Sequence, residues 1–349
     1  MALNLFDKIL PGRQRELSRV LDRAESLAAD GNFRQAIDVA TAANRTLEAP
    51  ELERRIMVWR VQAFPTMDRT GGPSSWPPAF ADPFPGLHGV PEIEFSELTA
   101  EVMGGAFQHH GSLLVRGLTT PEQAKKLQIG IDRAMKAREL SKGGGPMQEI
   151  SSWYVETPLD TATNAARGWL GGVWLADSPR MMYEFLELYE KRGVMRLLSD
   201  YLAEPLTISI GKSTLRRNEP DGSVHDWHQD GAFLGEDVRT VNVWLSLSDC
   251  GKDAPGLDIV GGRLPCVVQT GSHGARLEWT VGGGLVDELQ QAGTPVVSPV
   301  FRPGDAMLFD QLMLHRTAVR PEMDKTRYAI ESWFFTPSTF PLDQGPIMV

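Results

Sequence analysis

The stretch Trp227-His228-Gln229-Asp230 opens the segment WHQDGAFLG, residues 227–235, and guides how the rest of the chain is interpreted. We interpret it as part of a β-strand, in which residues two positions apart project from the same face. His228 and Asp230 would then reach one metal ion from one side, through an imidazole nitrogen and a carboxylate oxygen. An ordinary strand surface without a metal would show the same pair, so this interpretation depends on the other motifs of the chain.

A third potential metal ligand, His315, follows the apolar segment AMLFDQLML, residues 306–314. Its surroundings are those expected at a strand end that lines a cavity. Two histidines and one carboxylate occupy one face of an octahedron and leave the remaining positions open, which is the arrangement typical of non-haem iron(II) oxygenases. We therefore expect His228, Asp230 and His315 to bind Fe(II) and to be the catalytic residues.

Arg327 follows His315 within the segment Thr326-Arg327-Tyr328. A guanidinium can form a bidentate pair with a carboxylate, in a geometry that lysine does not match. The co-substrate 2-oxoglutarate has a distal carboxylate that needs such a partner, while its 1-carboxylate and 2-oxo group would chelate the iron. We expect Arg327 to bind the distal carboxylate; the alternative is a surface ion pair.

From Leu206 onward the sequence has the pattern of short β-strands. The segments with this pattern are LTISIGKSTLRR (206–217), TVNVWLSLSDC (240–250), TPVVSPVFRPGDAMLFDQL (294–312) and RYAIESWFF (327–335). Short strands at this spacing indicate a sandwich or a barrel. Before them we expect a strand over residues 111–118, then a helix with Thr120 as N-cap and Pro121 as first residue. The fold class is therefore mainly β with flanking α.

Residues 1–63 are expected to form an N-terminal helical extension, because apolar residues recur at helical spacing on either side of a turn at residues 30–32. The fragment LAADGNFRQAIDVATAANR, residues 27–45, resembles one tetratricopeptide-type helix pair, whereas a stable array needs about three. It therefore either packs on the main domain or docks a protein partner. Residues 64–92 are rich in proline, which disfavours helices and central strands, and should be a linker or a wrapping segment. Residues 93–349 would form the main domain.

Five segments in a fixed order carry a resemblance to a known family. They are WHQDGAFLG, VNVWLSL, DAPGLDIV, RPGDAMLFDQLMLHRT and RYAIESWFF. With them the chain resembles the phytanoyl-CoA dioxygenase family of Fe(II)/2-oxoglutarate-dependent oxygenases, over about Leu206 to Phe335 and more weakly back to Phe107. The resemblance implies a double-stranded β-helix (a cupin-like jelly roll) with iron at its open end. It also implies that 2-oxoglutarate and O2 are converted to succinate and CO2, usually with hydroxylation of a substrate.

The resemblance also implies roles for individual residues of this chain. Arg327 would bind the distal carboxylate of 2-oxoglutarate, Thr317 would add a hydroxyl to that carboxylate, and Trp244 would pack beside the co-substrate. Halogenating relatives replace the metal-binding carboxylate by a small residue, so Asp230 favours hydroxylation. The chain departs from the family at residues 260–263, Val-Gly-Gly-Arg, where many members have a Pro-Gly-Ser-His segment on the substrate side.

The bulk composition narrows the possible partners. The 349 residues carry a formal net charge of −10, which argues against a general affinity for nucleic acid. No apolar run is long enough for a membrane span or a signal peptide, and the two cysteines form no disulfide framework. We expect a cytoplasmic protein that acts on a small or medium-sized metabolite.

Three questions stay open from the sequence. The aromatic-rich segment 141–178 is either a lid that excludes water during the reaction or a layer that packs over the barrel. The same three metal ligands would also suit a metal-dependent cupin-type isomerase or hydrolase, which would not need Arg327 in its place. A non-catalytic sensor or scaffold, with a vestigial oxygenase fold and a partner-binding helical extension, is the third alternative.

Overall fold

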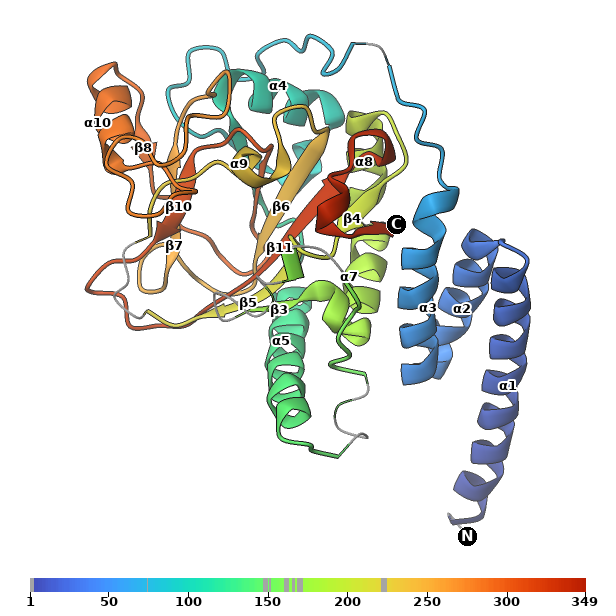
Figure 1. Ribbon diagram of the computed structural model, residues 1–349. Coiled ribbons are helices and arrows are strands. Elements are labelled where there is room, and N and C mark those ends of the chain that lie inside the picture. The colour runs from blue at the N-terminus through green and yellow to red at the C-terminus, as the bar shows by residue number, and fades with distance from the viewer. Residues whose placement is uncertain are drawn as a thin grey trace.

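Two β-sheets pack face to face at the centre of this computed structural model (Figure 1). The structure describes residues 3–73, 75–146, 150, 152–159, 163–164, 167, 172–220 and 225–349, with side chains described from residue 12 onward. The larger sheet has nine strands, in the order β1-β2-β9-β6-β11-β4-β12, with β5 paired to β11 and β3 paired to β5, and the smaller has the order β10-β7-β8. The fold is a double-stranded β-helix with flanking helices, as predicted.

The strands are short. Their bounds are β1 Glu92–Glu94, β2 Ser112–Arg116, β3 Gly172–Trp174, β4 Thr207–Ser209, β5 Thr214–Asn218, β6 Thr240–Ser246, β7 Gly256–Val260, β8 Val296–Val297, β9 Ala306–Phe309, β10 His315–Ala318, β11 Arg327–Phe335 and β12 Pro346–Met348. The helices are α1 Leu3–Ala29, α2 Phe33–Leu47, α3 Pro50–Ala63, α4 Ala100–His110, α5 Pro121–Lys142, α7 Pro179–Arg192, α8 Val194–Leu202, α9 Gly231–Leu234 and α10 Gly283–Gln291.

Strand alternation divides the larger sheet into two faces. Val243 and Leu245 of β6 belong to the core formed with helices α4, α5, α7 and α8 on the outside of the sheet. Trp244, between them, belongs to the core that the two sheets enclose, together with Ile259 of β7. Residues two positions apart along a strand share a face. The odd-numbered residues of β11 from Arg327 to Phe335 therefore face the interior of the barrel.

Of the N-terminal helices, α3 packs against the main domain, α2 packs on α3, and α1 packs on α2. The structure begins α5 at Pro121 with Thr120 as N-cap, as predicted, and turns the chain between α1 and α2 at Gly31, whose φ is 80°. Helix α3 packs against α7 and β12, and the Arg180 guanidinium lies 2.7 Å from the buried Glu53 carboxylate. In Figure 1 this extension, in blue, lies on the side of the barrel opposite β7 and β10. The domain limits drawn from the sequence stay a prediction.

The proline-rich segment between Thr66 and Glu92 wraps the barrel. Its described residues form no helix or strand. The ring of Trp76 lies edge-on to Tyr201 of α8, with 5.5 Å between centroids. Phe80 packs so closely on Gly104 of α4 that a Cβ at that position would overlap the ring. The glycine is therefore required by this close approach.

The structure differs from the sequence-based prediction at one strand of the larger sheet. The segment 206–217, predicted as one alternating strand, is split into β4 and β5 by a turn at residues 210–212. A Cβ at Gly211 would overlap the side chain of Thr163. In the aromatic segment, Tyr154 and Trp174 are buried. Trp169 and its neighbours lie outside the described residues, so the lid stays a hypothesis.

No helix in the described ranges is long and apolar enough to cross a membrane.

Candidate metal centre

Backbone pairing brings the two histidines together. The His228 N–H donates to the His315 carbonyl at 2.9 Å, and the His315 N–H donates to the His228 carbonyl at 3.0 Å. His315 is the first residue of β10 and pairs with Ile259 of β7. The two imidazole centroids are 4.3 Å apart. The pairing of residues far apart in the sequence thus places two nitrogen ligands side by side.

Asp230 reaches the histidines by a turn, so the prediction of a regular strand over 228–230 is wrong. His228 makes only a single bridge, and the Asp230 backbone, with φ −67° and ψ −20°, leads directly into α9. The turn is tight because Gly231 donates its N–H to the Gln311 carbonyl at 2.9 Å and has no room for a Cβ beside Val267. The carboxylate nevertheless lies beside His315, with Oδ2 3.7 Å from Nε2.

The three side chains fit a metal ion. Their ligand atoms all lie within 4.8 Å of one another. His315 Nδ1 donates to the Met313 carbonyl at 3.1 Å, which leaves Nε2 with a free lone pair toward the site. His228 Nδ1 and Asp230 Oδ2 are buried and have no hydrogen-bond partner among the described residues. Each such atom costs about 1–3 kcal/mol, and bound metal would offset that cost at Asp230.

The electrostatics favour the ligand forms of these residues. Burial, reinforced by the charge of His315, lowers the pKa of His228 to about 3, so its imidazole is neutral near pH 7. Burial would raise the pKa of Asp230, but Lys212 and the two histidines together bring that pKa below its usual value. The Lys212 ammonium lies 2.8 Å from Asp230 Oδ1. A neutral imidazole and an ionised carboxylate are the forms that bind metals.

Arg327 lies inside the barrel, so the alternative of a surface ion pair is wrong. It is 2 % exposed, and burial lowers its pKa to about 10. Its Nη1 donates to the Gly256 carbonyl at 3.2 Å, its Nη2 donates to Asn218 Oδ1 at 2.9 Å, and its Nε has no partner. Within the described part of the chain no carboxylate forms an ion pair with it. A buried guanidinium in this state is suited to an anionic ligand.

Trp244 lies close to Arg327, and Thr317 lies on a strand of the facing sheet. The Arg327 guanidinium carbon lies 5.5 Å from the centre of the buried Trp244 ring. Thr317 lies on the same face of β10 as His315 and pairs with Leu257, the neighbour of Gly256. The side chain of Thr317 therefore faces the same interior as that of His315.

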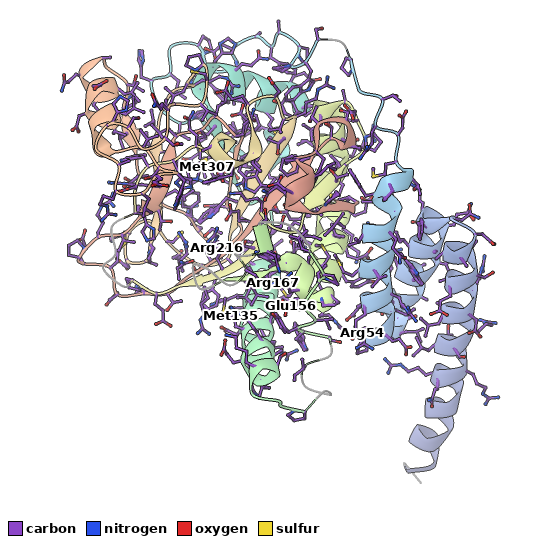
Figure 2. The ribbon with its side chains drawn as sticks, viewed as in Figure 1. Arg54, Met135, Glu156, Arg167, Arg216 and Met307 are labelled. Carbon is purple, nitrogen blue, oxygen red and sulfur yellow. The ribbon has the colours of Figure 1, made fainter. Side chains whose placement is uncertain are left out.

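Sequence reasoning missed Asn218, which pairs in register with Arg327 across β5 and β11. The alternation of β5 is the feature that places it inside, two positions after Arg216. Arg216, labelled in Figure 2, also points inward and pairs with Glu331 of β11. Because these polar side chains lie on the inner face of the larger sheet, a charged ligand would contact this face.

An aromatic pair forms the exposed side of the centre. The ring of Trp279 lies 5.8 Å from His228 and 5.4 Å from Phe233, centroid to centroid. Trp279 is 41 % exposed. A large indole that remains exposed beside a candidate metal ligand is a surface that a substrate could cover.

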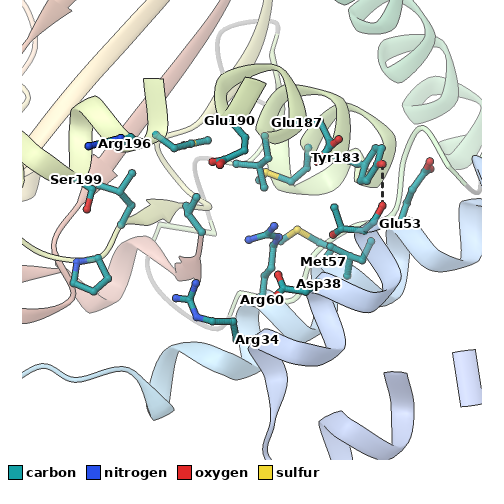
Figure 3. A pocket seen from close by; sticks show the side chains of 18 of the residues that line it. Arg34, Asp38, Glu53, Met57, Arg60, Tyr183, Glu187, Glu190, Arg196 and Ser199 are labelled. Atoms are coloured by element: carbon teal, nitrogen blue, oxygen red, sulfur yellow. Dashed lines mark hydrogen bonds between the residues drawn. The ribbon is translucent and has the colours of Figure 1, made fainter. Parts of the chain in front are cut away.

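A hollow of about 790 Å³ lies between helices α2 and α3 on one side and helices α7 and α8 on the other (Figure 3). Arg34, Asp38, Arg60 and Glu190 line it, so its charges have both signs. None of the candidate metal ligands lines it. We assign this hollow to the contact between the helical extension and the barrel, not to the metal centre.

The fold and the site define the class of protein: a jelly roll that holds two histidines and an aspartate in its interior. The model of the phytanoyl-CoA dioxygenase (PhyH) family matches residues 107–319, more than half of the sequence. The chain belongs to this family, as the resemblance indicated. A search of curated proteins found no significant match.

Several solved structures resemble the chain at low sequence identity. They include the non-haem α-ketoglutarate-dependent carbocyclase SnoK from nogalamycin biosynthesis (14% identity, TM-score 0.47, covering 70% of this chain and 87% of SnoK). EctD from S. alaskensis, with 2-oxoglutarate and 5-hydroxyectoine, has 16% identity and a TM-score of 0.46, covering 67% of this chain and 75% of EctD. AviO1 from Streptomyces viridochromogenes has 18% identity and a TM-score of 0.42, covering 67% of this chain and 94% of AviO1. Similarity at this level carries no information on the substrate.

Proposed function

We propose that this protein is an Fe(II)- and 2-oxoglutarate-dependent dioxygenase that hydroxylates a small or medium-sized molecule and releases succinate and CO2. His228, Asp230 and His315 would hold the iron. The proposal rests on two features that occur together inside one barrel, and both include polar atoms that lack a partner among the described residues. One is the set of three converging ligand atoms, and the other is the buried, unpaired guanidinium of Arg327.

Iron, when bound, would supply the position at which 2-oxoglutarate and oxygen react. The protein's own contribution is to bind and orient. Arg327 would pair with the distal carboxylate of 2-oxoglutarate, and Asn218 would fix the guanidinium through its 2.9 Å hydrogen bond. Trp244 would form one side of the co-substrate pocket and Thr317 would donate a hydroxyl to it. In a buried site each of these contacts acts more strongly than in water.

We infer that the substrate approaches over Phe233 and Trp279. These rings lie next to His228 on the side where the centre is exposed, whereas Arg327 lies on the buried side. A substrate that covers Trp279 would also exclude water from the metal centre while the reaction proceeds. The chemical identity of the substrate is not fixed by this geometry.

The two alternative functions explain less of the site. A metal-dependent cupin-type isomerase or hydrolase would use the three ligands but gives no reason for a buried arginine without a carboxylate partner. A scaffold with a vestigial site gives no reason for ligand atoms held within 4.8 Å of one another. The helical extension buries its apolar face against α7 and β12, which favours a structural role for it over the docking of a protein partner.

The test is the formation of succinate. Purified protein would be supplied with Fe(II), ascorbate, 2-oxoglutarate and oxygen, together with a broad panel of metabolites. We expect succinate above the level of a His315→Ala control, and more with an accepted substrate. If the intact protein forms no more succinate than His315→Ala with the whole panel, the proposed function is wrong.

A further inference from the structure

Lys212 is a half-buried residue that contacts the candidate metal centre and that the sequence motifs did not single out. It lies in the turn between β4 and β5, and its Nζ is 2.8 Å from Asp230 Oδ1. The Asp230 side chain is 3 % exposed and that of Lys212 is 21 % exposed. An ion pair at this depth is shielded from water and holds both groups in a defined geometry.

Lys212 is held both at its backbone and at its ammonium. The backbone N–H of Lys212 donates to Ser209 Oγ at 3.0 Å, which fixes the turn from which the side chain extends. Its Nζ lies 4.2 Å from the ring centre of Phe233, a cation–π contact. Phe233 belongs to α9, the helix that begins directly after Asp230. The lysine therefore contacts both the carboxylate and the element that carries it.

The two carboxylate oxygens of Asp230 are not equivalent. Oδ1 accepts from Lys212, whereas Oδ2 has no partner among the described residues and lies 3.7 Å from His315 Nε2. A carboxylate can bind a metal through one oxygen or through two. With Oδ1 occupied by the ammonium, only Oδ2 is available to the ion.

We propose that Lys212 is a positioning residue that makes Asp230 a single-oxygen ligand and so keeps one position at the metal open for 2-oxoglutarate or oxygen. This inference rests on the proposed function. Without the ammonium, the aspartate is free to turn and to bind through both oxygens, which removes a position that the co-substrate needs. Loss of the ammonium is therefore expected to change the affinity for 2-oxoglutarate more than the affinity for the metal.

The metal affinity is expected to change less, because two effects oppose each other. Loss of the ammonium loosens the carboxylate, which weakens metal binding. The same loss removes a positive charge from the neighbourhood of a divalent cation, which strengthens it. Groups that orient metal ligands are typically worth about 10–100-fold in affinity or activity.

The experiment compares Lys212→Met, which keeps the apolar stem and removes the charge, with Lys212→Arg, which keeps a charged donor. Lys142→Met is the matched control, since its side chain is 58% exposed and pairs with Glu139 on the surface of α5. Each protein is loaded with Co(II) without oxygen. The Co(II) absorption spectrum reports the coordination, titration with 2-oxoglutarate gives its dissociation constant, and competition with a chelator gives that of the metal.

For Lys212→Met we expect an altered Co(II) spectrum and a 2-oxoglutarate dissociation constant raised at least about tenfold, with a metal dissociation constant changed by less than that. Lys212→Arg should keep the Co(II) spectrum and the 2-oxoglutarate affinity of the unmodified protein, and so should Lys142→Met. An unchanged spectrum and 2-oxoglutarate affinity in Lys212→Met would overturn the proposal. So would loss of metal binding together with a lowered melting temperature in both Lys212 variants, which indicates a structural role.

A replacement variant and a comparison with the unmodified protein complete the test. If Lys212→Met does not fold, Lys212→Leu, which also keeps an apolar side chain and has no hydrogen-bond donor, takes its place with the same expected results. If the unmodified protein binds Co(II) and 2-oxoglutarate and forms succinate, but Lys212→Met does the same, only the role of Lys212 is refuted. If the unmodified protein itself forms no succinate, the proposed function fails first.

Discussion

Arg327→Met keeps most of the length of the side chain and removes its charge. Loss of one partner of a buried charged pair costs about 2–5 kcal/mol. Since about 1.4 kcal/mol is a factor of ten, the 2-oxoglutarate concentration that half-saturates succinate formation should rise by roughly 30-fold to 4,000-fold. Titration of 2-oxoglutarate in the succinate assay measures this change.

The same substitution should have the opposite effect on the stability of the protein without its ligands. Burial lowers the pKa of Arg327 from 12.5 to about 10, which corresponds to roughly 3 kcal/mol against the charged form. Loss of the hydrogen bonds to Gly256 and Asn218 offsets part of the gain. We expect Arg327→Met to melt at the same temperature as the unmodified protein or above it. An arginine with only a structural role would lower the melting temperature on removal.

Arg217→Met is the control for both measurements. Arg217 is the neighbour of Asn218 on β5, but it points outward, is 39% exposed and pairs with Asp132. This variant should keep the 2-oxoglutarate requirement of the unmodified protein. A requirement within threefold of normal in Arg327→Met, with succinate still formed, would refute the role of Arg327.

Three further outcomes follow from the site and its surroundings. Removal of metal by a chelator should lower the melting temperature, because a ligand present at about 100 times its dissociation constant stabilises by about 2.7 kcal/mol; His315→Ala should show no such response. Trp279→Ala should raise KM for the substrate and leave substrate-independent succinate formation unchanged, and an equal loss of both would place Trp279 elsewhere in the mechanism. Asp258→Asn should lower the unfolding free energy at pH 7 by about 1.5–3 kcal/mol, since Asp258 accepts from Arg316, Arg320 and Ser298.

The pH dependence of the last variant has a definite sign. Burial would raise the pKa of Asp258, but Arg320, Ser298 and Arg316 together lower it. A carboxyl whose pKa is lowered on folding contributes its stability above its unfolded pKa, about 3.9, and loses that contribution as the pH falls further. The stability difference between Asp258→Asn and the unmodified protein should therefore shrink as the pH falls below about 4. Acid denaturation followed by circular dichroism gives this comparison, and a constant difference would contradict it.

The sequence predicted those features that depend on local pattern. The N-cap Thr120 with Pro121 at the first position fixes the start of α5, and the apolar, β-branched run from residue 240 marks the strand β6. The spacing argument correctly placed His228 and Asp230 close to each other, but the strand geometry on which it relied is wrong. Asp230 reaches the site because the chain turns at Gly231, a consequence of contacts with Val267 and Gln311 that are distant in sequence.

Lys212 and Asn218 were beyond the reach of sequence pattern for a related reason. Their roles depend on where β5 pairs with β11 and on how far the turn before β5 brings a side chain toward Asp230. A shift of one residue in that register would turn Asn218 outward. Register of this kind is set by the packing of the whole sheet, so a single sequence with no motif at these positions does not predict it.

The unsatisfied polar atoms inside the barrel support one interpretation together. Native proteins leave few buried polar atoms without a partner. Besides His228, Asp230 and Arg327, the amide of Asn242 is 1 % exposed and has no partner for either its oxygen or its nitrogen among the described residues. Asn242 pairs with Phe309, whose ring lies 5.1 Å from that of His315. Unsatisfied groups that gather in one interior, around three metal-ligating side chains, indicate that the interior is completed by ligands, and the charge of Arg327 indicates that one of them is an anion.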